Sequence, residues 1–382
     1  MKVLITNRVL QNGSGTETVT RDLALELRRL CHEAVIYSPV LGPVAKQIQA
    51  QGIPVFTDIH QVNFVPDIIH GHHHAQTLTA LLQFPETPAI FVCHDAVAWH
   101  DDPLIFPRVL RYVAVDYRCR KRFEEIPQIP TEKIRVLFNA VDLSRFKPRP
   151  ALPGKPRRAA IFSNYATKAT HTNAVTKACK SLGIALDVIG KGFNTSTSRP
   201  EEVLPAYDIV FAKARCALEA MAVGSAVVLC DFAGLGTMVN CSNFSELHKL
   251  NFGAGTLLRP LDPELIAAEI KKYDAHEAKR VSERVRTEAG LTTAAVEWLE
   301  LYDEVIADNA LLKQRQDENR RPQELAALAD YLVKWGYDAR IELEKSRLKE
   351  LMDWPVLGRC VTWAMERQRM RMLSVRDVPR RP

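Results

Sequence analysis

Short apolar runs alternate with segments of helical periodicity in this chain, and this alternation occurs twice. The first series starts with MKVLIT at residue 1, and the second starts with RAAIFSN at residue 158. Apolar runs bounded by turn residues are typical of buried strands, and strands separated by helices form parallel sheets. Between the two series lies FKPRPALPGKPRR, residues 146–158, which is rich in proline and arginine. The sequence therefore predicts two α/β domains joined by a linker.

The predicted strands of each domain end in polar or small residues where the chain must turn. Those of the first domain are MKVLIT, AVIYSP, DIIH, AIFVCHD, YVAVD and RVLFNAVD; those of the second are RAAIFSN, ALDVIGKG, DIVF, SAVVLCD and GTLLRP. A helix is expected at residues 173–182. After Pro263 the chain is mostly helical, and Trp298, Leu301, Tyr302 and Val305 fit one helix face.

The last part of the chain is predicted to be a helical extension with a basic end. We divide the chain into residues 1–148, 149–305 and 306–382. The stretch KQRQDENRRPQE is interpreted as a hinge, and helices are expected at 323–350 and 356–371 with Pro355 between them. The last stretch of the chain contains two acidic residues and six arginines. The arginines are Arg367, Arg369, Arg371, Arg376, Arg380 and Arg381.

Composition restricts the class of protein. The chain has 382 residues, with 47% hydrophobic and 25% charged residues, which is a globular composition able to bury a core. Its eight cysteines form no C-x-x-C pair and lie largely in apolar runs, so we expect buried thiols in a reducing compartment. The chain starts directly with a strand and has no apolar run of about 20 residues. These features predict a cytoplasmic protein.

Two motifs are specific enough to suggest a family. NAVDLSRFKP, residues 139–148, matches the pattern N-G-V-D-x-x-x-F-x-P, and LEAMAVGSAVV, residues 218–228, matches E-A-M-A-x-G-x-P-V-V. Weaker matches run in the same order over residues 1–305. On these motifs the chain resembles the family-4 glycosyltransferases of GT-B fold. The resemblance implies two Rossmann-like lobes, with the acceptor on the first and a nucleotide sugar on the second.

The resemblance also implies a reaction. The sugar would pass from the nucleotide sugar, which is a substrate and not a cofactor, to a glycan or small-molecule acceptor. Anomeric configuration would be retained and no metal would be needed. One position departs from the family pattern of two glutamates eight positions apart: the second matches Glu219, but the first falls on Phe211, which cannot accept hydrogen bonds from a sugar.

Charged residues in the second domain are the first site candidates. The resemblance makes Glu219 the acceptor of hydrogen bonds from the nucleotide ribose. Lys213 and Arg215 follow the predicted strand DIVF, at the end where open α/β sheets bind ligands. A diphosphate leaving group gains negative charge as the glycosidic bond breaks, and fixed cations stabilise that charge. We therefore predict a catalytic role for Lys213 and Arg215.

In the first domain, His94 ends the strand AIFVCHD, and the resemblance places a histidine there near the reacting carbon. Glycine turns are the remaining candidates, because they bring backbone close to a nucleotide or open a helix N-terminus toward an anion. The residues concerned are Gly13, Gly15, Thr16, Gly190, Gly192, Gly234 and Gly236.

A histidine cluster, His70, His72, His73 and His74, raises the question of a metal site. No aspartate or glutamate completes a spaced ligand set beside it in the sequence, so we predict no metal. No P-loop or nucleophile elbow is present either. The aromatics do not interleave with the arginines, so nucleic-acid binding is not expected.

Other interpretations remain open at this point. Phe211 in place of glutamate is consistent with a degenerate transferase that binds a sugar nucleotide or glycan without turning it over. A sugar-nucleotide epimerase would share the two-lobe plan. The extension also has three interpretations: docking onto the lobes, self-association, or contact with an anionic membrane surface.

Overall fold

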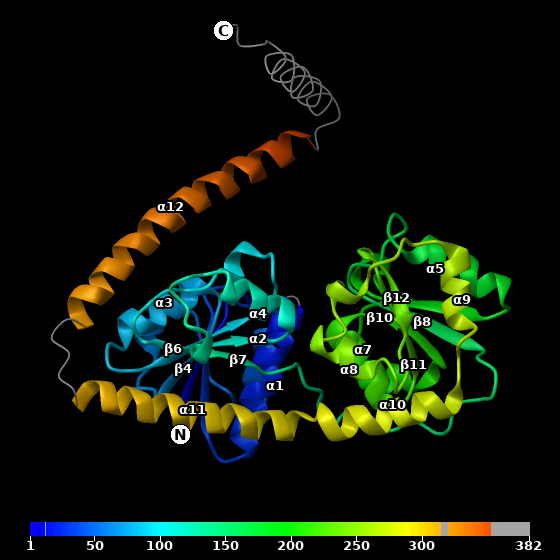
Figure 1. The fold of residues 1–382 in the computed structure, drawn as a ribbon, viewed down its shortest axis with the longest axis horizontal. Helices are drawn as coiled ribbons and strands as arrows, with labels where there is room; N and C mark the ends of the chain where they lie inside the picture. Colours follow the sequence, from blue (N-terminus) through cyan, green and yellow to red (C-terminus); the bar gives the residue numbers. More distant parts are fainter. Residues whose placement is uncertain (12, 315–319, 353–382) are drawn as a thin grey trace, which may run out of the picture. The chain divides into compact units, whose positions relative to one another are not determined.

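The computed structural model describes residues 1–11, 13–314 and 320–352. The chain divides into two units, Met1–Asp317 and Glu318–Pro382. The first unit contains both sheets, each with its own helices, and we call these two halves the first and second lobes (Figure 1).

The first lobe is built on a parallel sheet with the order β3-β2-β1-β4-β5-β6-β7. Its strands are continuous apolar runs, as expected for a parallel sheet that is buried on both faces. The strands are β1 (Lys2–Thr6), β2 (Glu33–Tyr37), β3 (Val55–Phe56), β4 (Ile68–His72), β5 (Ala89–Cys93), β6 (Val109–Ala114) and β7 (Ile134–Val136). The helices are α1 (Gly15–Arg29), α2 (Pro43–Ala50), α3 (His74–Gln83) and α4 (Tyr117–Glu124), with short 3-10 turns η1 (Ile59–Gln61), η2 (Trp99–Asp101) and η3 (Thr131–Lys133).

The second lobe has a sheet with the order β12-β11-β10-β8-β9, in which β12 alone among these strands runs antiparallel to its neighbour. Its strands are β8 (Arg158–Phe162), β9 (Ala185–Ile189), β10 (Ile209–Ala212), β11 (Ala226–Asp231) and β12 (Gly234–Met238). The helices are α5 (Thr172–Ser181), α6 (Pro200–Val203), α7 (Ala214–Val223), α8 (Phe244–Lys249), α9 (Pro263–Ile270) and α10 (Ala275–Glu288), with 3-10 turns η4 (Lys191–Phe193), η5 (Leu204–Ala206) and η6 (Ala254–Thr256).

Most predicted strands are confirmed, and two are corrected. The predicted strand RVLFNAVD is strand only to Val136, where β7 ends. The predicted strand GTLLRP is wrong: it contains the 3-10 turn η6 and a single bridge between Leu235 and Arg259. Leu258 within it is 85% exposed, so this run does not have the burial of a core strand.

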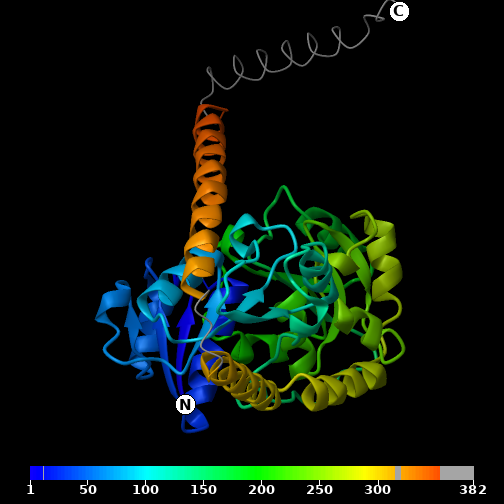
Figure 2. The ribbon, with the colours of Figure 1, turned by 60° about the vertical axis from the view of Figure 1, so that its left-hand side comes forward.

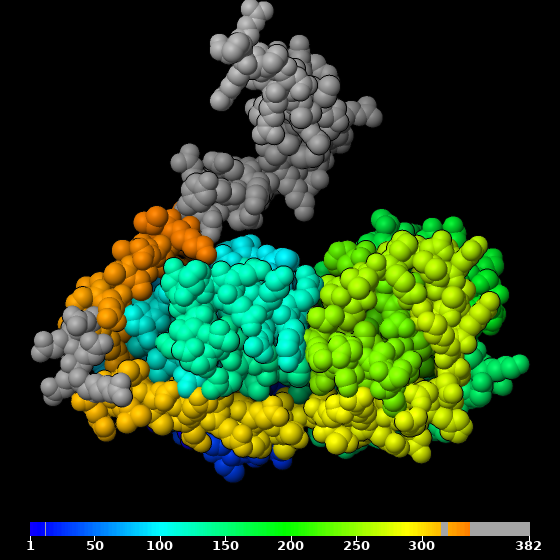
Figure 3. Space-filling model, viewed as in Figure 1, coloured from blue at the N-terminus to red at the C-terminus, as the bar shows by residue number. Residues whose placement is uncertain are grey.

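The helix α11 (Leu291–Gln314) starts after the second lobe and packs on the first, against α1, β4 and β6 (Figures 1 and 2). Its predicted apolar face is buried, and the phenol of Tyr302 is 2.5 Å from Nδ1 of His70. In the space-filling view α10 and α11 form one band along both lobes (Figure 3). The predicted boundary between residues 305 and 306 therefore falls inside a helix that packs on the first lobe.

The second unit is described as one long helix, α12 (Arg320–Met352), which covers the predicted helix at 323–350. Of its apolar side chains, Leu325, Leu332 and Trp335 are more than one third exposed. The predicted helix at 356–371, Pro355 and the terminal arginines lie outside the described residues. Among the described helices, none is both long and apolar enough to cross a membrane.

Candidate functional site

Lys213 is the single residue between β10 and α7. The strand ends at Ala212, and the helix begins at Ala214, which has a positive φ of 48°. Phe211 is therefore part of β10, and its ring is fully buried in the core between the sheet and α5 and α9. The position that the family pattern assigns to a sugar-binding glutamate is a core position in this fold. The Phe211 ring therefore contributes to core packing and has no exposed surface with which to contact a sugar.

Arg215 forms an ion-pair network at the start of α7. Its guanidinium contacts Asp22, which lies on α1 in the first lobe, and its Nε lies 2.9 Å from Oε1 of Glu219. Arg21 and Arg145 also pair with Asp22, at 2.7 and 3.9 Å. Burial alone would raise the pKa of Asp22, but the guanidinium groups around it bring that pKa below its ordinary value. Arg215 is thus a buried link between the lobes.

Glu219 lies on the same buried network. It is 6% exposed, and burial raises the pKa of its carboxyl, which Arg215 only partly opposes. One of its oxygens already accepts a hydrogen bond from Arg215. A ligand hydroxyl that donates to Glu219 must therefore share this carboxylate with the arginine.

Lys213 belongs to a second cluster, at the carboxyl ends of β8, β10 and β11. Its Nζ lies 3.1 Å from Oδ2 of Asp231, the last residue of β11. Oδ1 of the same aspartate accepts hydrogen bonds from the hydroxyl of Ser163 at 3.2 Å and from the backbone N–H of Phe232 at 2.7 Å. His171, at the start of α5, has its Nδ1 3.7 Å from Oδ1. Lys213 is 21% exposed, so part of its charge faces outward.

The predicted glycines of the second lobe pack closely on protein. A Cβ at Gly190 would lie 2.0 Å from the carbonyl oxygen of Ser163, and one at Gly192 would lie 2.2 Å from that of Ala166. These two glycines therefore let the β9–α6 connection approach the loop after β8. Gly234 and Gly236 are in β12, where a Cβ would meet the carbonyl oxygens of Leu257 and Thr256 at 2.8 and 3.0 Å.

The glycine turn of the first lobe is held by an acidic side chain. Gly13 has a φ of 67°, and Gly15 and Thr16 open α1. The carboxylate of Glu17 accepts the backbone N–H groups of Gly13 and Ser14, at 3.1 and 3.2 Å. The amide of Gly13, one of the residues predicted to meet an anion, is therefore bound to a carboxylate of the chain itself.

His94 lies at the end of β5 and is partly buried. Its Nε2 is 2.9 Å from Nδ1 of His72, the last residue of β4. Burial lowers the pKa of His94 to about 4 and that of His70, which lies in β4 with His72, to about 3. These rings are therefore neutral at pH 7. His94 can donate or accept a hydrogen bond at this edge, but it brings no charge.

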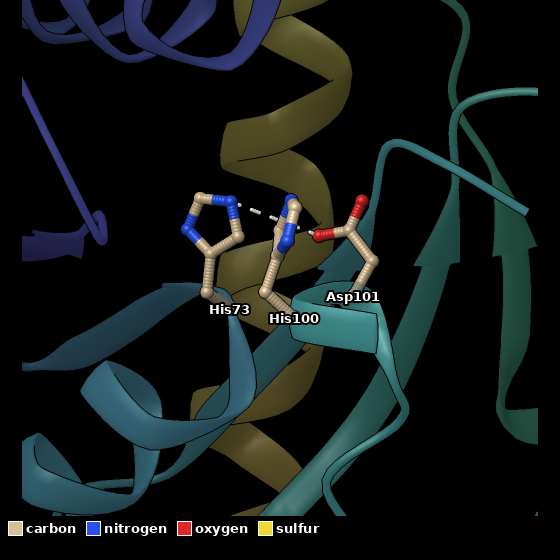
Figure 4. A group of neighbouring side chains, drawn as sticks. All are labelled: His73, His100 and Asp101. Carbon is tan, nitrogen blue, oxygen red and sulfur yellow. Dashed lines mark ion pairs between the residues drawn. The ribbon is translucent and has the colours of Figure 1, made fainter. Parts of the chain in front are cut away.

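Three further side chains gather beside His94: His73, His100 and Asp101 (Figure 4). Nε2 of His73 is 3.8 Å from Oδ1 of Asp101, an oxygen without a hydrogen-bond partner among the described residues. The other oxygen accepts the backbone N–H of His94 at 3.2 Å. Burial raises the pKa of Asp101 to about 7. In the described part of the chain, this is the one group of residues that could hold a metal ion.

The tautomer of His73 decides what this group can do. The backbone N–H of Arg8 donates to Nδ1 of His73 at 3.1 Å, so neutral His73 carries its proton on Nε2, facing Asp101. A metal-bound histidine instead donates its second ring N–H to an acceptor. The arrangement is thus a histidine–carboxylate pair, and the absence of a metal stays a prediction. The sequence separation of His73 and Asp101 explains why this pair was not predicted.

Comparison with solved structures identifies the architecture. A glycosyltransferase of Rickettsia africae aligns with 80% of this chain and 98% of its own, at 15% identity and a TM-score of 0.59. The HepE protein of Anabaena, in complex with UDP and glucose, aligns over 79% and 99%, at 14% identity and a TM-score of 0.57. The chain has the GT-B fold. No protein-family model matches the sequence, and no curated protein sequence is significantly similar to it.

Within this GT-B fold, the candidate residues form two groups. Lys213, Gly190 and Gly192 lie at the carboxyl edge of the second sheet, and Glu219 lies on α7 in the buried network of Arg215 and Asp22. His94 lies at the same edge of the first sheet, with the His73–Asp101 pair beside it. The ion pair between Arg215 and Asp22 on α1 joins the two lobes.

Proposed function

We propose that the chain is a glycosyltransferase that transfers a sugar from a nucleotide sugar to an acceptor. The observation that carries this proposal is the Lys213–Asp231 pair with the close-packed glycine turns at the carboxyl edge of the second sheet, and Glu219 on the helix that follows Lys213, in a chain of GT-B fold. Ligands of open α/β sheets bind at that edge. The UDP and glucose in the Anabaena HepE structure support a sugar nucleotide as the ligand class.

Lys213 is the residue we assign to the diphosphate. Its ammonium is partly exposed and oriented by Asp231, so it can meet charge on the leaving phosphate without large rearrangement. Glu219 would accept a ribose hydroxyl beside Arg215. We assign Arg215 a different role from Lys213: it holds the donor lobe against Asp22 of the acceptor lobe, and so positions Glu219.

We further propose that the reaction belongs to the retaining, family-4-like type and requires no metal. In that type the leaving phosphate assists deprotonation of the acceptor. The acceptor would lie at the first-lobe edge, near His94. Seven cysteines in the described residues are free thiols, which supports a reducing, cytoplasmic setting.

The test is a thermal-shift screen with UDP, GDP, ADP and CDP, followed by a hydrolysis and transfer assay with the matching sugar nucleotides. A bound nucleotide stabilises the folded chain by mass action and so raises its melting temperature. The unfolding free energy increases by about 2.7 kcal/mol at a hundredfold excess over the Kd. We expect one nucleotide to stabilise the chain and its sugar conjugate to be consumed. A chain that none of the four stabilises would refute the proposal.

A non-catalytic sugar-nucleotide-binding protein is the second candidate, and the Arg215–Glu219 contact is the observation that favours it. A glutamate already bonded to arginine has less capacity to hold a ribose in the reactive position. Nucleotide binding without hydrolysis or transfer in the same assay would establish this candidate. An epimerase would convert the sugar without an acceptor, and product analysis separates it from both.

A further inference from the structure

Two aromatic rings stand exposed at the carboxyl edge of the second sheet. Tyr165 follows β8 and is 59% exposed, and Phe232 follows β11 and is 49% exposed. Their ring centroids are 5.2 Å apart, although 67 residues separate them in the sequence. Exposing two neighbouring rings forgoes burial of apolar surface, and aromatic side chains so placed are typical of ligand contact surfaces.

Lys213 contacts both of these rings. Its Nζ lies 5.0 Å from the centroid of each ring, so that both rings contact the same ammonium. Asp231 pairs with that ammonium and also accepts a hydrogen bond from the backbone N–H of Phe232. The rings, the cation and the carboxylate therefore form one ordered cluster, which binding does not have to assemble.

A buried histidine also lies beside this cluster. His171 is fully buried, and neither of its ring nitrogens has a hydrogen-bond partner in the described part of the chain. Its Nδ1 is 3.7 Å from Oδ1 of Asp231. Buried polar groups are usually hydrogen-bonded, so an unpartnered imidazole beside Asp231 adds hydrogen-bonding capacity to this cluster.

We propose that Tyr165 and Phe232 form an aromatic platform that stacks against a ring of the sugar nucleotide, while Lys213 binds the adjoining phosphate. This inference rests on the proposed function, and it adds the residues that recognise the ring part of the donor. A nucleobase and a sugar ring both present a flat face to an aromatic side chain. The phosphate next to that ring would complete the coordination of Lys213.

The expected effect is a loss of affinity that depends on the ligand. Removing one stacked aromatic weakens binding of a base by about 5-fold or more. Inorganic pyrophosphate has the phosphates but no ring, so it isolates the contribution of Lys213. Tyr165→Ala and Phe232→Ala should therefore leave pyrophosphate affinity unchanged. Lys213→Met, in contrast, should weaken the binding of every ligand that has a phosphate.

The experiment is calorimetric titration of pyrophosphate, the four nucleoside diphosphates and their glucose conjugates into the full chain. Wild type is compared with Tyr165→Ala, Phe232→Ala, the conservative Tyr165→Phe, and Leu82→Ala, a control at an exposed apolar position on α3 of the first lobe. Weaker binding of the nucleoside diphosphate places the base on the platform. Weaker binding of the sugar conjugate alone places the sugar ring there.

Three outcomes overturn the platform. The first is unchanged affinity for every ligand in both alanine variants. The second is an equal loss for pyrophosphate and nucleotide, which shows that the rings only support Lys213. The third is failure of wild type to bind any nucleotide, and this outcome refutes the proposed function as well. Melting temperatures of all variants show whether each chain has folded.

Discussion

The carboxyl edges of the two sheets differ in their electrostatics. The edge of the second sheet has paired charges: Lys213 with Asp231, and Arg215 with Glu219. The edge of the first sheet has histidines whose burial keeps them neutral, with His94 at its end. A charged, partly open cation suits a phosphate, and neutral hydrogen-bonding rings suit an uncharged hydroxyl. This difference is the physical basis on which we propose that the donor binds the second lobe and the acceptor the first.

The largest expected effect comes from Arg215, which joins the two lobes through Asp22. Arg215→Ala leaves the buried carboxylates of Asp22 and Glu219 without their shared partner. Breaking a buried ion pair in this way costs about 3–5 kcal/mol of unfolding free energy. We expect a large fall in stability, measured by urea denaturation.

The control for Arg215 is a variant that also removes the stranded charges. Asp22→Asn and Glu219→Gln added to Arg215→Ala should recover much of the stability, because amides cost less to bury than carboxylates. If Arg215→Ala unfolds at the same urea concentration as wild type, the residue is not a structural link. Its role would then return to the catalytic one expected from the sequence.

Acid should destabilise the buried histidines at the carboxyl edge of the first sheet. The pKa values of His70 and His94 are lowered to about 3 and about 4 in the folded chain, against about 6.5 in an unfolded one. A lowered histidine pKa means that the unfolded state binds more protons. This stability is therefore fully present above pH 6.5 and is lost as the pH falls toward 4 and 3.

Thermal unfolding between pH 7.5 and 4 measures this effect. We expect the melting temperature to fall below pH 6.5 and the slope to be smaller in His94→Gln, which cannot be protonated. His60, an exposed histidine on η1, provides the control, since His60→Gln should keep the wild-type slope. Equal slopes in all three proteins would show that the buried histidines do not determine the acid limit.

Much of this arrangement could be predicted from sequence, and the rest depended on contacts between distant segments. The strand–helix alternation predicted both sheets, because parallel strands buried on both faces are apolar throughout. Glu219 was predicted from its motif, and Lys213 from its place after the strand DIVF. Asp22 was not predicted, because it lies in an ordinary amphipathic helix and gains its role only when Arg215 of the other lobe meets it. Phe211 was matched to a family glutamate by counting residues from Glu219, and the count alone could not show that it is a buried residue of β10.

Lys213 tests the assignment of the phosphate to the second lobe. Removing one preorganised donor to a developing charge costs about 100-fold or more in kcat. Lys213→Met should therefore lower kcat with the donor that wild type accepts, and Lys213→Arg should keep part of it. Lys180→Met, at an exposed position on α5, is the control variant. Wild-type kcat in Lys213→Met would show that the ammonium serves only Asp231.

Metal removal should have the smallest effect on kcat, for a separate reason at the carboxyl edge of each sheet. At the edge of the first sheet, the backbone N–H of Arg8 donates to Nδ1 of His73. A cation at Nε2 would therefore require the other tautomer and the loss of that hydrogen bond. At the second, Asp231 already pairs with Lys213 and accepts hydrogen bonds from Ser163 and Phe232. A carboxylate engaged in this way has little capacity left to hold a metal–diphosphate bridge, and the ammonium supplies the positive charge that such a metal would bring.

The measurement compares kcat and metal content before and after dialysis against EDTA. We expect unchanged turnover. Activity that EDTA removes and Mg²⁺ or Mn²⁺ restores would contradict the charge assignment at the second edge, and Lys213→Met would then be expected to depend on the metal even more strongly. Activity restored by Zn²⁺ alone, and lost in His100→Ala, would instead identify His73, His100 and Asp101 as ligands. The tautomer of His73 argues against that result, because the Arg8 amide and a protonated Nδ1 would direct two hydrogens at each other.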